Sequence, residues 1–162
     1  MNYFELFEIP IAPAVDKSLL ERKYFALQKK HHPDRFVNAD DAESESMLQQ
    51  SATVNKAYSI FKNSQKTIEY FLQVNGLIQT DEKYNLPPDF LLEMMELNES
   101  LTEENERGIE NKVVEFEENI YKEIQPVIEQ YTSNTSKQEL GKLKEYYYKK
   151  KYLQRILDRL GV

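Results

Sequence analysis

The two histidines of this 162-residue chain are adjacent, at positions 31 and 32, and Pro33 and Asp34 follow them directly. Imidazole nitrogens could bind a transition metal, and His32 could act as a general base. Neighbouring residues of a helix point about 100° apart, however, so both histidines cannot easily ligate one ion. His32 also has no nucleophile or orienting partner in the pattern. We therefore expect neither a metal site nor a catalytic base at this position.

The rest of the sequence offers no other catalytic group of residues. Cysteine is absent, which excludes disulfides, thiolate metal sites and cysteine nucleophiles. There is no glycine-rich phosphate loop and no nucleophile–base pair, and the many glutamates follow helix surfaces instead of converging. We expect a protein that is not an enzyme and that holds no cofactor.

The adjacent histidines lie where a predicted helix ends. That helix runs from about residue 16 to 31, with Asp16 or Ser18 as its N-cap, and Pro33 stops it because proline disfavours helical geometry in the preceding residue. Hydrophobic periodicity predicts a second long helix over 43–62 and short helices over 3–9 and 65–75, the last closed by Gly76. This order indicates a helical hairpin clasped by two small helices, within residues 1–75.

The second half of the chain predicts a separate helical bundle. Periodicity fails before the Pro87-Pro88 pair, so residues 76–87 are expected to form a linker. Three further helices are predicted over 88–102, 104–131 and 136–160, which would form a three-helix bundle within residues 88–162. Pro126 should kink the middle helix, because its ring removes one backbone hydrogen bond. The predicted fold class is all-α, with four helices followed by three.

Charge is unevenly distributed along the chain. The net charge of −7 argues against a general nucleic-acid binder, which normally carries a basic surplus. Between positions 17 and 35, six basic residues outnumber two acidic ones, whereas between positions 89 and 119 eleven acidic residues outnumber two basic ones. Opposite charges in two parts of one chain suggest two different partners.

The basic residues of the 16–31 helix gather on one side of it. At about 100° per residue, this side lies opposite the predicted core stripe of Leu20, Tyr24 and Leu27. It carries Arg22, Lys29 and Lys30, with Lys23 at the edge. Spacing alone therefore predicts a cationic helix face that ends in an acidic loop. The same pattern also fits a solvated surface beside an ordinary proline stop, and an isolated His-Pro-Asp tripeptide does not separate the two.

Several segments together resemble the J-domain of the HscB-type co-chaperones, which serve iron–sulfur cluster assembly. They are residues 3–7 (YFELF), Tyr24 and Leu27, residues 31–36 (HHPDRF) and residues 49–58 (QQSATVNKAY). The resemblance covers the first 75 residues. Arg35 stands where many J-domains have lysine, so the charge is kept.

This resemblance implies a mechanism for the first domain. The loop of His32, Pro33 and Asp34 would dock on an ATPase chaperone of the heat-shock-seventy class, of the HscA or DnaK type, and stimulate its ATP hydrolysis. The basic face of the preceding helix would join in that contact through Arg22, Lys23, Lys29 and Lys30.

The predicted helix after Pro88 carries a second apolar patch. Phe90, Met94, Leu97 and Leu101 form the narrow stripe expected to face the core. Three apolar residues lie elsewhere on its circumference, beside acidic ones: Leu91, Leu92 and Met95, with Glu96, Glu99 and Glu103. The pattern alone leaves open whether another part of the protein or a partner covers them. The HscB resemblance implies a partner, the IscU-type scaffold that carries the nascent cluster, and adds Tyr152 to the same surface.

The remaining expectations concern location and alternative partners. No signal peptide or membrane-spanning apolar run is found, so a cytoplasmic protein with no membrane partner is expected. We also expect the protein to be monomeric and to bind no nucleic acid. One alternative is a J-domain co-chaperone that serves a different client. Another is a helical nucleic-acid binder that uses the tyrosines and lysines of residues 146–152. These residues scatter around all sides of one helix, which disfavours a flat stacking platform.

Overall fold

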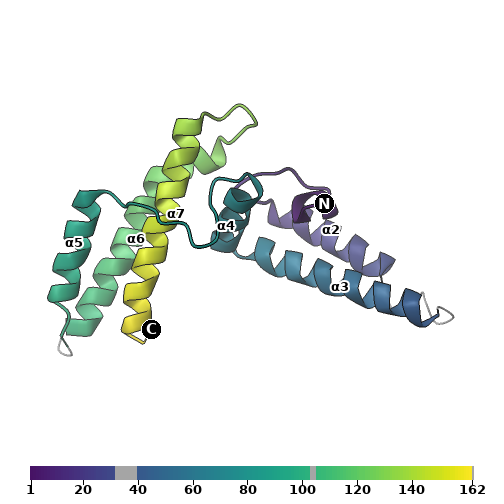
Figure 1. The fold of residues 1–162 in the computed structure, drawn as a ribbon, viewed down its shortest axis with the longest axis horizontal. Helices are drawn as coiled ribbons and strands as arrows, with labels where there is room; N and C mark the ends of the chain where they lie inside the picture. Colours follow the sequence, from purple (N-terminus) through teal and green to yellow (C-terminus); the bar gives the residue numbers. More distant parts are fainter. Residues whose placement is uncertain (32–39, 103–104, 162) are drawn as a thin grey trace. The chain divides into compact units, whose positions relative to one another are not determined.

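The computed structural model describes residues 1–31, 40–102 and 105–161. Within these ranges the chain forms seven helices and no strand (Figure 1), so the all-α fold class is confirmed. The chain divides into two compact units, Met1–Gly76 and Leu77–Val162. Each unit is described by itself below.

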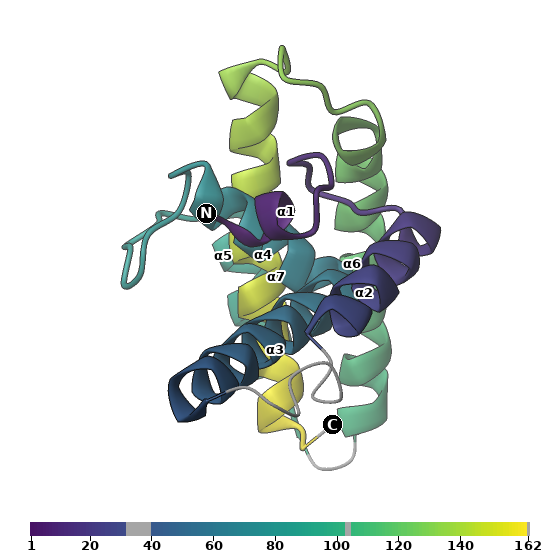
Figure 2. The same ribbon diagram turned by 90° about the vertical axis from the view of Figure 1, so that its right-hand side faces the viewer.

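The first unit holds two short and two long helices, in the predicted order. These are α1 (Tyr3–Leu6), α2 (Lys17–Lys30), α3 (Asp41–Lys62) and α4 (Ser64–Val74). Helices α2 and α3 lie side by side as a hairpin (Figures 1 and 2). The unit therefore presents one helical arm, which α2 and α3 form together.

Side-chain caps fix where these helices begin. Asp16 caps α2 by accepting hydrogen bonds from the backbone N–H groups of Ser18 (2.8 Å) and Leu19 (3.2 Å), so Asp16 and not Ser18 is the N-cap. Asp40 caps α3 in the same way through the N–H of Glu43, which starts this helix two residues before the predicted position. At the end of α4, Gly76 has a φ of +68°, as expected of a residue just past a C-cap.

Aromatic side chains form the core of the first unit. Phe4, Phe7 and Phe61 are fully buried, and the ring of Phe61 lies 5.0 Å from that of Phe4 and 5.7 Å from that of Phe7. Other residues of the long and short helices are buried with them: Leu20, Val54, Ala57, Ile68, Phe71 and Leu72. Of the predicted core stripe of α2 only Leu20 is fully buried, because Tyr24 and Leu27 are half-buried against α3. This shared core fixes α2 against α3.

The second unit contains α5 (Pro88–Glu99), α6 (Glu106–Glu129) and α7 (Lys137–Arg159). Helices α6 and α7 run side by side, and Phe90 of α5 contacts both of them through the rings of Phe116 and Tyr152. Helix α5 ends three residues before the predicted position. Its C-cap is Ser100, whose hydroxyl donates a hydrogen bond to the carbonyl oxygen of Leu97.

The segment predicted as a linker, 76–87, contains no helix but is tied to α7. The ring of Tyr84 stacks on that of Tyr148, with centroids 4.4 Å apart. Glu82 accepts hydrogen bonds from Lys144 (2.9 Å) and from the hydroxyl of Tyr148. Residues 77–87 accordingly belong to the second compact unit.

Candidate functional site

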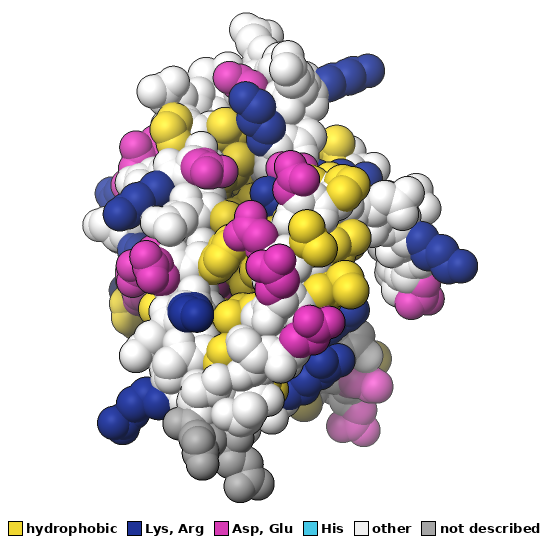
Figure 3. All heavy atoms as spheres, turned by 90° about the vertical axis from the view of Figure 1, so that its left-hand side faces the viewer, with side chains coloured by type: hydrophobic (Ala, Val, Ile, Leu, Met, Phe, Trp, Pro, Cys, Tyr) yellow, Lys and Arg dark blue, Asp and Glu magenta, His cyan; other side chains and the backbone are white. Residues whose placement is uncertain are grey.

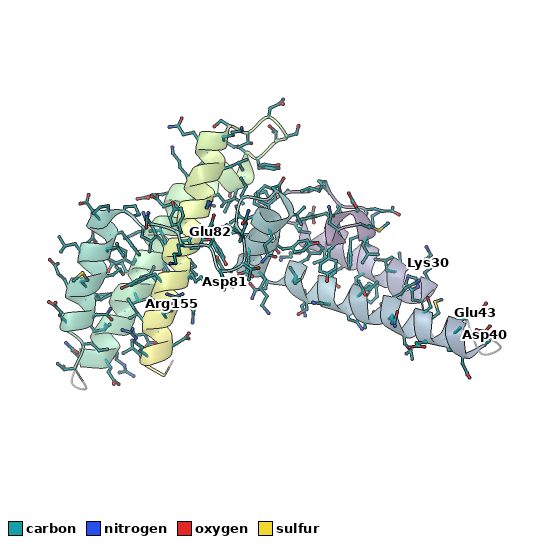
Figure 4. All side chains as sticks on the ribbon, viewed as in Figure 1. Lys30, Asp40, Glu43, Asp81, Glu82 and Arg155 are labelled. Atoms are coloured by element: carbon teal, nitrogen blue, oxygen red, sulfur yellow. The ribbon has the colours of Figure 1, made fainter. Side chains whose placement is uncertain are left out.

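Helix α2 presents its cationic residues on the side away from the core of the first unit. Arg22, Lys29 and Lys30 are exposed. Lys23, predicted to lie at the edge of this face, forms an exposed ion pair with Glu8 at 3.3 Å. Figure 4 shows Lys30 at the end of the hairpin where α3 begins with Asp40 and Glu43. Four cations thus line one helix that leads to the hairpin tip.

Two sets of predicted contact residues lie outside the described residues. They are His32, Pro33 and Asp34 of the loop, and Glu103 after α5.

His31 is the last described residue before the loop, and burial together with the nearby charge of Lys30 lowers the pKa of His31 below 6.5. At neutral pH this imidazole is therefore uncharged, and the cationic face owes its charge to lysine and arginine.

The opposite side of α2 is fastened to α3 by a polar and aromatic cluster. The rings of Tyr24 and Tyr58 stack with centroids 3.8 Å apart, and Asn55 Oδ1 accepts hydrogen bonds at 2.8 Å from Tyr24 Oη and from Gln28 Nε2. The hydroxyl of Tyr58 donates to Glu21, which raises the pKa of Tyr58 to about 12. Because Glu21 is the acidic residue of α2, this bond turns its carboxylate toward α3 and away from the cationic face.

One residue of this face was not among the predicted contact residues. Phe25 is 61% exposed, three residues after Arg22 and four before Lys29, so it shares their side of the helix. The sequence carried the signal for it, since a helical projection places Phe25 about 100° to 160° from the residues of the core stripe. The cationic face therefore also contains an exposed aromatic ring.

Helix α5 separates its apolar residues into two sets as predicted, except that Leu101, expected in the core stripe, lies beyond the end of this helix and is half-buried. Phe90, Met94 and Leu97 are buried in the second unit, whereas Leu92 and Met95 are 58% and 54% exposed. Figure 3 shows hydrophobic side chains gathered over α5 with acidic side chains along their border. Leu91 lies between the two sets and is half-buried. We call Leu91, Leu92 and Met95 the α5 patch.

Carboxylates follow one edge of the α5 patch. Glu96 and Glu99 are exposed, and Glu96 also lines a groove between α5 and α6, where Glu93 and Glu115 outnumber one cation, Lys112. Among the described residues, no group of three or more acidic or histidine side chains is arranged to hold a metal ion. The edge is suited to the cationic side chains of a partner protein.

The last helix brings one further predicted residue to this surface. Tyr152 of α7 is half-buried, and its ring meets that of Phe90 edge to face, with centroids 5.9 Å apart and planes at 78°. Because Phe90 is buried, Tyr152 packs against the core side of α5, on a residue next in sequence to the α5 patch. The structure brings Tyr152 next to α5, while its part in partner binding stays a prediction.

Comparisons with known proteins identify the family. The family model described as the HSCB C-terminal oligomerisation domain matches residues 86–161. A co-chaperone protein HscB homolog of Psychromonas ingrahamii is 33% identical over 124 residues, which cover 74% of this chain and 73% of that protein. The chain belongs to the HscB family of co-chaperones. A homolog from Vibrio cholerae is 44% identical over 102 residues, which span 62% of this chain and 60% of the length of that HscB protein.

Solved HscB structures show the same fold. The chaperone HscB from Vibrio cholerae has a TM-score of 0.64 and 31% identity, covering 99% of this chain and 96% of that one. Human co-chaperone HscB has a TM-score of 0.76 and 26% identity, covering 99% and 81%. The first unit is accordingly the J-domain of an HscB fold, and the second unit is its C-terminal helical domain.

The tyrosine- and lysine-rich run of α7 is largely engaged inside the HscB C-terminal domain. Tyr146 is buried, Tyr148 stacks on Tyr84, and Lys150 pairs with Glu117. These contacts occupy side chains that a nucleic-acid-binding platform would need to expose. No helix in the described ranges is both long and apolar enough to cross a membrane.

Proposed function

We propose that this HscB-family protein stimulates ATP hydrolysis by a heat-shock-seventy-class chaperone of the HscA or DnaK type, and that it delivers an IscU-type iron–sulfur scaffold protein to that chaperone. The observation that carries the proposal is the α5 patch, where Leu92 and Met95 stand more than half exposed beside glutamates in the family's C-terminal domain. An apolar patch of this kind on a folded domain indicates a protein partner.

The J-domain acts on the chaperone through the cationic face of α2 and the His32-Pro33-Asp34 loop. Arg22 and Lys29 attract an acidic surface and speed the encounter, while Phe25 adds apolar contact between them. The proline restrains the loop and the aspartate accepts charged hydrogen bonds from the chaperone. Stimulation follows if the J-domain binds the hydrolysing conformation of the chaperone more tightly than the resting one.

The C-terminal domain binds the scaffold through the α5 patch and Tyr152. Burial of an exposed Leu or Met side chain contributes about 1.5–3 kcal/mol, so Leu92 and Met95 are the expected anchors. Glu96 and Glu99 border them and orient a partner that carries cationic groups, and the family resemblance adds Glu103 to the residues that contact this partner. The iron–sulfur cluster is cargo of the scaffold and needs no ligand from this chain.

Single-turnover ATP hydrolysis by the cognate chaperone tests both parts of the proposal. We expect the protein alone to raise the rate, and the protein together with scaffold to raise it further than either does alone. Scaffold that increases the rate equally in the absence of this protein would contradict the delivery role. A rate that stays at its basal value in every mixture would contradict the ATPase role.

A J-domain co-chaperone for a different client remains the second candidate, because the J-domain residues would be the same in both cases. Pull-down of purified scaffold with the wild-type protein and with Leu92→Ala/Met95→Ala separates the two. Retention by the wild type and loss in the variant supports the scaffold as the client. Equal absence of scaffold in both samples supports another client.

A further inference from the structure

A cleft in the C-terminal domain lies between the 77–87 segment and α7. It has a volume of about 300 Å³, and every residue that lines it belongs to Leu77–Val162. Figure 4 shows Arg155 on α7 and Glu82 on the segment that crosses this helix. Its wall combines three cations with aromatic and apolar side chains: Lys83, Lys151 and Arg155, with Tyr84, Tyr152 and Leu86.

The cations of the cleft are not neutralised within the domain. Among the described residues, no carboxylate forms an ion pair with Lys83, Lys151 or Arg155. Other lysines of α7 differ, since Lys149 pairs with Glu145 and Lys150 with Glu117. Glu82, which also lines the cleft, is already engaged by Lys144 and Tyr148. The cleft is therefore a positive site in a chain whose net charge is −7.

The aromatic wall is held in place by contacts of its own. Tyr84 and Tyr148 are parallel within 5° at 4.4 Å, and Lys144 Nζ lies 5.6 Å from the centre of the Tyr84 ring on which it packs. Such a preformed wall of rings and aliphatic carbon, beside ammonium and guanidinium groups that pair with no described carboxylate, suits a ligand that is acidic and partly apolar. The Lys151 ammonium itself lies 5.9 Å from the centre of the Tyr147 ring, a contact that leaves its charge in place. An acidic polypeptide segment has this chemistry.

The cleft is connected to α5, the helix that carries the patch, through one residue. Tyr152 lines the cleft and also contacts Phe90, which directly precedes Leu91 and Leu92 of the patch. Glu96 and the groove it lines lie on the other flank of α5, toward α6. Helix α5 thus has an acidic groove on its α6 side, and it contacts Tyr152, a residue of the cationic cleft.

We propose that the cleft binds an acidic segment of the same scaffold protein that covers the α5 patch. This inference rests on the proposed scaffold-binding function and adds a second, electrostatic contact to it. A client held at a negative edge and a positive cleft can dock in one orientation only, because the reversed orientation places like charges together. The cleft therefore sets the direction in which the scaffold lies on α5.

Charge reversal in the full-length protein tests the inference. We expect Lys151→Glu/Arg155→Glu to weaken the binding of purified scaffold about tenfold at low salt, with a difference that shrinks as sodium chloride is added. Both side chains are exposed, so the fold should tolerate the change. The matched control is Lys122→Glu/Lys137→Glu, which makes the same change in net charge at exposed positions outside the cleft. The milder Lys151→Gln/Arg155→Gln variant should show a smaller loss.

Zero-length carbodiimide coupling supplies the second measurement. This reagent joins a lysine amine to a carboxylate within contact distance, so Lys151 should become linked to an aspartate or glutamate of the scaffold. Wild-type scaffold affinity in Lys151→Glu/Arg155→Glu, or an equal loss in the control, overturns the inference. The inference is also overturned if the wild type binds a single-stranded oligonucleotide and Lys151→Glu/Arg155→Glu loses that binding while it keeps its affinity for the scaffold. That result would indicate a nucleic-acid ligand.

Failure of the proposed function gives a different result. In that case the wild-type protein itself does not bind the scaffold, and Leu92→Ala/Met95→Ala gives the same result as the wild type. If the wild type binds the scaffold and the α5 variant does not, while the cleft variant binds normally, only the inference about the cleft falls. ATPase stimulation measured without scaffold should be the same in the cleft variant and the wild type.

Discussion

At the scale of single residues, exposure separates the side chains that stabilise the fold from those that we propose to bind partners. Phe90 and Met94 are buried, whereas Leu92 and Met95, on the same helix, are more than half exposed. Exposed Leu and Met side chains gain free energy only when a second surface covers them. The α5 patch should therefore contribute to binding and very little to stability.

The first prediction follows from this separation. Leu92→Ala/Met95→Ala should weaken scaffold binding about a hundredfold or more, because two anchors lose their burial in the complex. Titration calorimetry with purified scaffold measures the change. Val114→Ala, at an exposed apolar position of α6, should stay within about twofold of the wild type. Wild-type affinity in the α5 variant would move the binding site elsewhere.

Glu82 leads to a prediction about pH. The hydrogen bond from the Tyr148 hydroxyl, followed by that from Lys144, lowers the pKa of Glu82 below 4.5. A carboxyl group whose pKa is lowered by folding stabilises the protein above its unfolded-state pKa, and this stabilisation is lost as the pH falls through the folded-state value. Glu82→Gln should thus be less stable than the wild type at neutral pH, with a gap that closes below about pH 4.5.

Urea unfolding followed by tyrosine fluorescence measures that gap at each pH. Glu118→Gln, at an exposed position of α6, serves as the control and should unfold like the wild type throughout. A difference between Glu82→Gln and the wild type that is the same at neutral and acidic pH would show that the carboxylate charge is not what joins the 77–87 segment to α7.

At the scale of helices, α2 has two sides with different tasks. Its inner side is fastened to α3 by the Tyr24–Tyr58 stack and by the hydrogen bonds to Asn55, while its outer side presents Arg22, Phe25 and Lys29. A fixed inner side gives the outer side one orientation before the partner arrives, which lowers the entropy lost on binding. The cationic face can then be altered without disturbing the hairpin.

Charge reversal on this face should slow association with the chaperone. Arg22→Glu/Lys29→Glu is expected to reduce the association rate constant about tenfold at low salt, with a difference that fades as salt rises. Stopped-flow mixing with fluorescently labelled chaperone measures the rate. Lys56→Glu/Lys66→Glu changes the charge equally at exposed positions of α3 and α4 and should have a smaller effect. Equal slowing in both variants would show that only net charge matters.

Helix identities could be predicted from the sequence, because apolar periodicity and capping residues are local signals. Boundaries depended on details such as Asp40, which caps α3 earlier than expected, and Glu8, whose φ of 53° accompanies the early end of α1. The contacts of Glu82 and Tyr84 with α7 join residues more than sixty positions apart. No local pattern signals such contacts, so the 77–87 segment could only be read as a linker.

The candidate sites were predictable to different degrees. The division of α5 into buried and exposed apolar residues followed from helical spacing, and Phe25 could have been found by the same projection. The contact of Tyr152 with α5 came from family resemblance alone, since nothing near Tyr152 in the sequence points to Phe90. The cationic cleft was not predicted, because its walls come from two segments distant in sequence.

At the scale of the whole molecule, one chain carries two compact units with separate surfaces. Under the proposed function, covalent connection keeps the bound scaffold at a high effective concentration near the chaperone. Residues 1–76 and 77–162, added as separate fragments, should therefore lose the extra ATPase stimulation by scaffold, while the J-domain fragment keeps its own stimulation. Circular dichroism of each fragment is the control for folding. Full synergy from unlinked fragments would contradict delivery by connection.

The most direct test of the account is the single-turnover ATP hydrolysis rate of the chaperone with Asp34→Asn in place of the wild type, with and without scaffold. Asp40→Asn is the matched control, since it makes the same chemical change at the α3 N-cap and asparagine caps helices as well as aspartate does. We predict that Asp34→Asn leaves the rate at its basal value while scaffold binding and helical content stay normal, and that Asp40→Asn stimulates like the wild type. Normal stimulation by Asp34→Asn would contradict the account.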